Sequence, residues 1–181
     1  MRTRRARRGA AAPASQRGKL LAGAVLLALV LPAVVRSLVL EPFGVPTASM
    51  APTVQAGEHV LANKLAYRLS PPRRGELAVL ERPGSGEILL KRIVAVGGDR
   101  VAIEDGVLLV NGRPRHERYV NERLVDSVYF GPVRVPRGSV FVLGDNRFDS
   151  RDSRSFGPVP DDDLIGRVML RIWPLERIGP L

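Results

Sequence analysis

The stretch Ile88–Val96 reads ILLKRIVAV, and this run of branched and apolar residues is typical of a β-strand. Lys91 interrupts the run, in a chain that has 25 arginines and only three lysines. Arginine does not lose its proton in a protein, whereas a lysine removed from water does so readily. A neutral amine beside a hydroxyl is a base beside a nucleophile. The stretch therefore predicts a strand of a β-rich fold and a candidate catalytic base.

Other segments after residue 41 have the same character and predict a mainly β domain over residues 41–181. Asp105-Gly106 and Asn111-Gly112 flank a short apolar run, and both pairs are typical of two-residue hairpin turns. Proline and glycine break the rest into short pieces, so no long amphipathic helix is expected there. The further strand-like runs are Glu76–Leu80, Val107–Val110, Ser139–Leu143 and Gly166–Trp173.

The segment before this domain predicts a membrane anchor. Residues 1–19 carry seven cations and no acid, and the sixteen residues Leu20–Val35 carry no charge. A helix over residues 20–40 would span about 31 Å, against a hydrocarbon core of about 30 Å. Basic residues stay on the cytoplasmic side. We therefore expect a cytoplasmic tail over residues 1–19, one transmembrane helix over residues 20–40, and an extracytoplasmic domain beyond it in the plasma membrane of the cell.

Two other interpretations of this segment remain open. A cleaved secretory signal has the same basic start, although the apolar stretch is long for one and no convincing cleavage site follows it. A buried core helix is the weaker alternative, because the segment is apolar on all faces. The basic tail has no aromatic residue to stack on bases, so we expect no nucleic-acid partner. Cysteine is absent, which excludes thiol nucleophiles, disulfides and cysteine-based zinc sites.

Four segments, in this order, resemble the boxes of the type I signal peptidases, the membrane-bound Ser–Lys proteases that remove signal peptides. Ser49 lies in the first of them and Lys91 in the third. Any one of these segments alone would be a weak match, but their order and their combination with an anchor are specific. The four segments are Glu41–Thr53, Arg74–Val79, Lys91–Asp99 and Gly144–Arg154.

The resemblance implies a role for each matching residue. Ser49 would be the nucleophile and Lys91 its general base, while the Thr47 hydroxyl and the Ser49 backbone N–H would form the oxyanion hole. Ser150 would orient the lysine by a hydrogen bond. Arg92 with Asp145, and Asp152 with Arg154, would form supporting ion pairs. The residues that would line shallow pockets for small side chains are Phe43, Val45, Pro46, Met50 and Leu90. Gly97 and Glu76 depart from the residues usual in the family.

The family also implies a fold and a set of partners. We expect an antiparallel β catalytic core with a small inserted β lobe over about residues 104–137, no cofactor and no metal. The substrates would be the signal peptides of exported preproteins, met at the lipid bilayer near the export translocon.

Three alternative functions are weaker. His59 and His116 formally allow a Ser-His-Asp triad, but neither lies in a recognisable motif. A self-cleaving, repressor-type Ser–Lys protease would need a soluble DNA-binding partner segment, which a membrane span argues against. A non-enzymatic membrane-anchored β module is disfavoured because Ser49, Lys91 and Ser150 are all intact.

Overall fold

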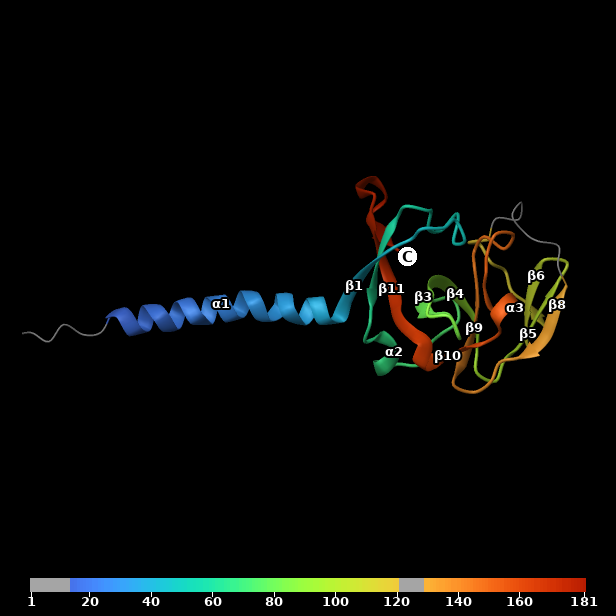
Figure 1. Cartoon of the computed structure of the whole chain (residues 1–181), viewed down its shortest axis with the longest axis horizontal. Coiled ribbons are helices and arrows are strands. Elements are labelled where there is room, and N and C mark those ends of the chain that lie inside the picture. Colours follow the sequence, from blue (N-terminus) through green and yellow to red (C-terminus); the bar gives the residue numbers. More distant parts are fainter. Residues whose placement is uncertain (1–13, 121–128) are drawn as a thin grey trace, which may run out of the picture. The chain divides into compact units, whose positions relative to one another are not determined.

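The computed structural model describes residues 14–120 and 129–181, so the first two thirds of the expected basic tail and part of the expected inserted lobe lie outside the described residues. The chain divides into two compact units, Met1–Leu38 and Val39–Leu181. Helix α1 (Ala14–Val39) occupies most of the first unit (Figure 1). When only the described residues are counted, none of the helices combines the length and apolar character needed to cross a membrane.

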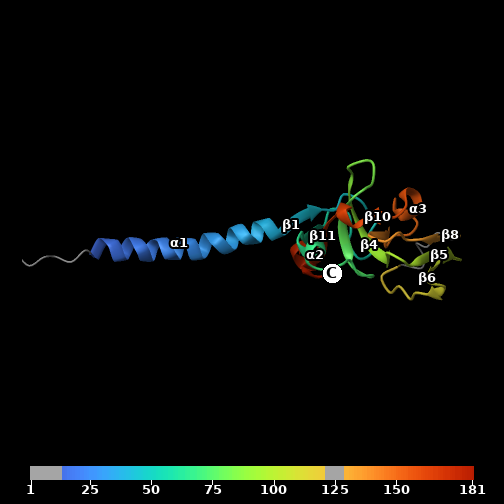
Figure 2. The same cartoon turned by 90° about the horizontal axis from the view of Figure 1, so that it is seen from below.

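The second unit is built on an antiparallel main sheet, drawn from two directions in Figures 1 and 2. Its strands follow the order β1-β2-β11-β3-β4-β9-β10, and β12 pairs with β11. The expected antiparallel, mainly β domain is therefore present. The strands are β1 (Leu40–Gly44), β2 (His59–Asn63), β3 (Leu77–Glu81), β4 (Ile88–Val96), β9 (Ser139–Leu143), β10 (Val159–Pro160), β11 (Leu164–Trp173) and β12 (Gly179–Pro180).

A second antiparallel sheet lies between β4 and β9 in the sequence. It has the order β7-β6-β5-β8. Its two hairpin turns have positive φ at Asp105 (49°), Gly106 (77°), Asn111 (56°) and Gly112 (73°), as the favoured two-residue turns require. The predicted turns are therefore confirmed. The strands are β5 (Arg100–Glu104), β6 (Val107–Val110), β7 (Arg113–Pro114) and β8 (Phe130–Arg134).

The second sheet is joined to the main sheet at a narrow neck, where the chain leaves after β4 and returns before β9. The Gly98 N–H donates to the Val135 carbonyl at 2.9 Å, and the Val135 N–H donates to the Asp99 carbonyl at 2.8 Å. A Cβ on Gly97 would come within 3.0 Å of the Arg137 Cα. The outgoing and returning segments therefore lie in direct contact, and glycine is needed for this approach.

The main sheet is buried on both faces because its central strands are continuous apolar runs, whose successive residues point to opposite faces of the sheet. On β3, Leu77 and Val79 belong to one core cluster, while Ala78 and Leu80 belong to another. A third cluster joins β4 and β9 to the second sheet, with Phe141 fully buried in it. Helices are short in this unit: α2 (Ala66–Leu69), α3 (Ser153–Phe156), η2 (Asp161–Asp163) and η3 (Leu175–Arg177).

The strand predictions are confirmed with small shifts in two strands. The observed β4 and β9 have the expected bounds, and β3 begins and ends one residue later than expected. Strand β11 begins two residues earlier, at Leu164, and its register against β3 shifts between Leu164 and Gly166. That irregularity accommodates Gly166, where a Cβ would meet the Asn63 carbonyl oxygen at 2.9 Å.

Candidate active site

Strand β4 places two cations side by side in the interior. Lys91 pairs with Ala78 of β3, and Arg92 pairs with Leu77. Consecutive residues of a strand point to opposite faces of the sheet, so the two side chains reach different environments. Lys91 is 2% exposed and Arg92 is 8% exposed. The lysine predicted from its unusual position is therefore buried, as expected.

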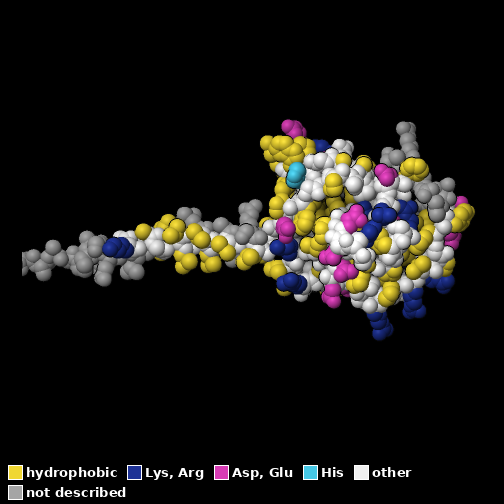
Figure 3. All heavy atoms as spheres, viewed as in Figure 1, with side chains coloured by type: hydrophobic (Ala, Val, Ile, Leu, Met, Phe, Trp, Pro, Cys, Tyr) yellow, Lys and Arg dark blue, Asp and Glu magenta, His cyan; other side chains and the backbone are white. Residues whose placement is uncertain are grey.

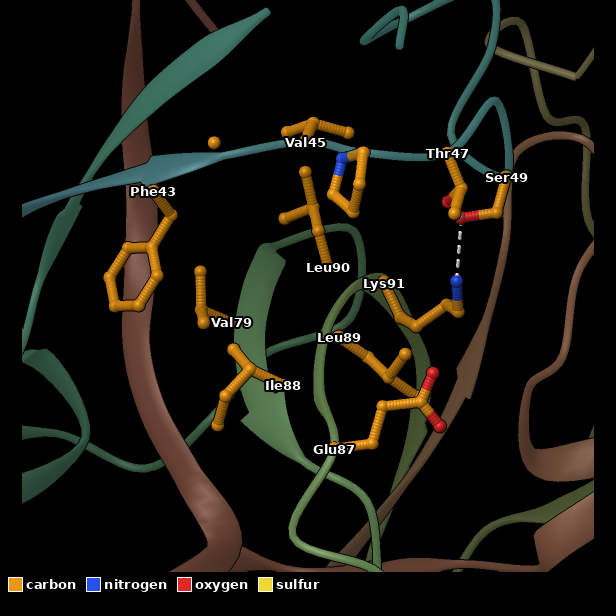
Figure 4. A pocket seen from close by; sticks show the side chains of 12 residues that line it. Phe43, Val45, Thr47, Ser49, Val79, Glu87, Ile88, Leu89, Leu90 and Lys91 are labelled. Atoms are coloured by element: carbon orange, nitrogen blue, oxygen red, sulfur yellow. Dashed lines mark hydrogen bonds between the residues drawn. The ribbon is translucent and has the colours of Figure 1, made fainter. Parts of the chain in front are cut away.

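Lys91 meets Ser49, which lies in the turn that follows β1. The Lys91 Nζ is 2.7 Å from the Ser49 Oγ, and this contact is the dashed line in Figure 4. The Thr47 hydroxyl donates to the same Ser49 Oγ at 3.2 Å. The structure therefore brings together, across 42 residues of sequence, the three side chains that the first and third boxes suggested.

Burial lowers the pKa of Lys91 from its usual 10.5 to about 8. An apolar environment disfavours the charged amine because it cannot replace the water that hydrates it. The nearby carboxylates of Asp152, Glu87, Asp145 and Asp149 act in the opposite direction, since their negative charge favours the protonated form. Removal from water is the larger effect, so about half of Lys91 is neutral at pH 8 and roughly a tenth at pH 7.

The Ser49 turn is held from behind by the turn that follows β9. The Asn146 N–H donates to the Ser49 carbonyl at 3.1 Å, and the Asn146 side-chain amide donates to the Ala48 carbonyl at 3.3 Å. Gly144 lies so close that a Cβ there would collide with the Ser49 carbonyl oxygen and with Ser150. The conformation of Ser49 therefore depends on residues about a hundred positions further along the chain.

Both expected ion pairs are formed beneath this turn. Arg92 donates from Nε and Nη2 to the two oxygens of Asp145, at 2.8 and 2.7 Å. Asp145 also accepts the Thr53 hydroxyl, at 2.5 Å. Arg154 donates from Nε and Nη2 to Asp152, at 2.9 and 3.0 Å. Asp145 thus ties β4 and the segment after Ser49 to the turn that follows β9, and the hydrogen bonds to its charged carboxylate are stronger than neutral ones.

The expected hydrogen bond between Ser150 and Lys91 is not formed. The Ser150 Oγ is buried and has no hydrogen-bond partner among the described residues. Its side chain packs instead against the backbone of Gly144. The sequence predicted the segment in which Ser150 lies, but it did not predict the orientation of the Ser150 side chain.

A small hollow of about 80 Å³ opens beside Ser49 and Lys91, between β1 and the first half of β4 (Figure 4). A water molecule needs roughly 10–15 Å³ by the same measure, so the hollow has room for a short side chain. Phe43, Val45, Pro46 and Leu90 line it as expected. Met50 does not line it, because it is fully buried in the core beneath the turn.

Several lining residues were not anticipated: Gly44, Val79, Glu87, Ile88 and Leu89. Gly44 and Leu89 immediately flank residues that were, Ile88 and Glu87 lie two and three positions before Leu90, and Val79 pairs with Leu90 from the neighbouring strand β3. Most of these residues could have been found from their closeness in sequence to Phe43 and Leu90, because a strand that forms the wall of a cleft contributes consecutive residues to it. His59 and His116 are exposed and neither lines the hollow.

Comparison with known proteins gives consistent matches. A family model described as signal peptidase, peptidase S26, matches residues 18–173. The signal peptidase I of Leptolyngbya laminosa is 36% identical over 163 residues, which cover 86% of this chain and 79% of that protein. The signal peptidase I of Bacillus caldolyticus is 35% identical over 159 residues, 81% of this chain and 87% of that protein. A crystal structure of a signal peptidase I from Enterococcus faecalis aligns at a TM-score of 0.48 and 30% identity, over 54% of this chain and 97% of that one.

Proposed function

Because this chain belongs to the signal peptidase family S26, we propose that Ser49 and Lys91 are the catalytic dyad with which it cleaves its substrates. The protein is a serine endopeptidase that removes signal peptides. The observation that carries the assignment of the dyad is the 2.7 Å contact between the Ser49 Oγ and the Lys91 Nζ. Both side chains are at least nine-tenths buried, so the base and the nucleophile are shielded from water.

The geometry supports a reaction in two halves. The neutral Lys91 amine takes the Ser49 hydroxyl proton as the Oγ attacks the scissile carbonyl carbon. The resulting ammonium then gives this proton to the departing amine when the C–N bond breaks, which leaves an ester on Ser49. In the second half Lys91 takes a proton from water, whose oxygen attacks the ester carbonyl, and returns the proton to the Ser49 Oγ. No proton is gained or lost over the cycle.

Thr47 is suited to stabilise the negative oxygen that forms in each half. Its hydroxyl donates to the Ser49 Oγ at 3.2 Å, which places a donor beside the atom that becomes bonded to the carbonyl carbon. The Ser49 backbone N–H is the second proposed donor. A preorganised donor acts strongly in a site from which water is excluded.

The hollow beside Ser49 supports a preference for small side chains near the cleaved bond. Much of its lining is apolar and comes from β1, β3 and β4, and Val79 on β3 is itself buried, as is Val45 just after β1. Buried strand residues do not move aside easily, because interiors are close-packed. A large side chain would therefore be rejected by steric overlap, which is an effective form of selection.

We extend the proposal to a membrane location, in which residues 20–40 anchor the catalytic domain outside the plasma membrane with the basic tail in the cytoplasm. The support is the uncharged run Leu20–Val35 after seven cations. Four leucines of α1, Leu21, Leu26, Leu27 and Leu38, are more than 60% exposed, and Figure 3 shows hydrophobic side chains along this helix. The bilayer would cover them, close to the place where exported preproteins leave the translocon.

The dyad is tested by cleavage of a purified preprotein. Ser49→Ala and Lys91→Met are each expected to abolish cleavage, while Lys64→Met, which removes a lysine paired with Glu41 at the surface, keeps it. Circular dichroism establishes that all three variants are folded. Near-normal activity of a folded Lys91→Met protein would overturn the assignment of the base.

The topology is tested separately on intact spheroplasts. Added protease is expected to digest the residues beyond 40 and to leave the cytoplasmic tail untouched. Full protection of the catalytic domain would contradict the proposed orientation without affecting the dyad.

A further inference from the structure

Glu117 and Tyr119 follow β7 in the segment that belongs to the second sheet, yet their side chains contact two buried arginines next to the active site, Arg147 in the turn after β9 and Arg92 on β4. The Glu117 Oε2 lies 2.6 Å from the Arg147 Nη2, and both side chains are less than one-tenth exposed. The Tyr119 hydroxyl donates to the Glu117 Oε1 at 2.6 Å. We call the segment Glu117–Tyr119 the strap.

The strap also covers the second buried arginine. The Arg92 guanidinium lies 3.8 Å from the centre of the Tyr119 ring, which is a close cation–π contact. That guanidinium makes the paired hydrogen bonds to Asp145. Burial raises the pKa of Tyr119, so its hydroxyl stays protonated and remains a donor to Glu117.

Both arginines hold the turn at residues 144–147, which in turn holds the nucleophile. Arg147 donates from Nε to the Gly144 carbonyl at 3.0 Å, and Arg92 binds Asp145 in the same turn. The next residue, Asn146, donates its N–H to the Ser49 carbonyl. From Glu117 to the backbone of Ser49, the path therefore consists of Arg147, one turn and one hydrogen bond.

Removing Glu117 would leave the Arg147 charge buried without a counter-charge, which is strongly unfavourable. The guanidinium would then move toward water and release the Gly144 carbonyl. We propose that Glu117 and Tyr119 are positioning residues for catalysis, which fix the Ser49 hydroxyl through Arg147, Arg92 and the turn between them. This inference rests on the proposed role of Ser49.

The test compares Glu117→Gln and Tyr119→Phe with matched variants of the same lobe, Glu104→Gln and Tyr129→Phe. Tyr129 also donates to a carboxylate, that of Asp105, but it is 68% exposed. Each protein is assayed for kcat and KM on a preprotein. Hydrogen–deuterium exchange of the Asn146 amide reports on the hydrogen bond to Ser49 without any substrate.

A small displacement of a reacting group costs up to about 100-fold in rate. We expect kcat to fall roughly 10-fold in Tyr119→Phe and up to about 100-fold in Glu117→Gln, with KM changed less than about twofold. Exchange at Asn146 should become faster in both, and both control variants should behave like the wild type.

Unchanged kcat and unchanged exchange at Asn146, measured well below the melting temperature, would overturn the inference and leave the strap a stabilising contact only. If Glu117→Gln does not fold, Tyr119→Phe decides, because its ring still covers Arg92. If Ser49→Ala cleaves as well as the wild type, the proposed function fails, and the exchange at Asn146 still decides whether the strap fixes the turn.

Discussion

Replacing Glu87 by Gln should make the enzyme faster at neutral pH. Glu87 lines the hollow beside Lys91, and its negative charge raises the pKa of that lysine. Without this charge the pKa falls and more of the lysine is neutral. The change needs no new contact with substrate, because Glu87 would act only through the proton equilibrium of the base.

The size of the effect follows from the pKa of Lys91, which is about 8. At pH 7 roughly 9% of such an amine is neutral, and complete neutralisation would therefore raise the rate about 11-fold. Glu87 is 48% exposed and paired with Arg82 at 3.3 Å, so water and this partner screen its charge. A screened interaction of about 0.7 kcal/mol corresponds to roughly half a pKa unit. The neutral fraction would then rise to about 24%, a gain of roughly 2.5-fold.

The assay is the pH dependence of kcat/KM between pH 6 and 10 on one preprotein. For the wild type we expect kcat/KM to rise about tenfold per pH unit below 8 and to level off above about 9. Glu87→Gln should shift this curve to lower pH and coincide with the wild type on the plateau. Glu81→Gln, which removes an exposed acid of β3 that does not line the hollow, is the control. Superimposable curves for wild type and Glu87→Gln would refute the reasoning, and so would a gain that persists at pH 10.

Three further predictions concern the same site. Thr47→Val should lower kcat about 100- to 1,000-fold with little change in KM, while Thr47→Ser stays close to the wild type; equal kcat for wild type and Thr47→Val would make Thr47 a turn residue only. Lys91 has a lower pKa folded than unfolded, so the wild-type free energy of unfolding should rise by roughly 3 kcal/mol from pH 8 to 10.5; urea denaturation of Lys91→Met should lack this rise. Replacing His59 and His116 together by Gln should keep kcat/KM within about twofold, and a loss of several orders of magnitude would revive the triad.

Much of the main sheet could be predicted because its strands are continuous apolar runs between turn residues. In β4 the run is apolar except for two cations, and that contrast identified Lys91 before any partner was known. The hairpin turns were equally predictable, since Asp-Gly and Asn-Gly adopt positive φ more easily than other pairs. These are local properties, and the sequence states them directly.

The orientation of individual side chains within turns could not be predicted. Met50 follows the nucleophile in sequence and was expected in the substrate pocket, yet it points into the core, where it is fully buried. Ser150 was expected to contact Lys91, yet it packs on Gly144. Neighbours in a turn point in different directions, and tertiary packing decides which of them faces the cleft.

The strap was missed for a different reason. Glu117 and Tyr119 lie in a segment without hydrophobic periodicity or a motif, and their partners Arg147 and Arg92 are 30 and 27 residues away in the sequence. A charged residue in such a segment is normally solvated. Glu117 is buried against Arg147 only because the chain returns toward the main sheet after β7.

The narrow neck at Gly97 has a consequence for how proteins built on this plan can diverge. The chain segments that leave β4 and return to β9 touch each other at this neck. The whole segment between them could therefore be replaced by one of another length while β4 and β9 stay in place. Such an exchange would keep the sheet but remove the strap. A shortened or foreign lobe would then give a folded protein with a misaligned serine, unless the graft brought its own acid to Arg147.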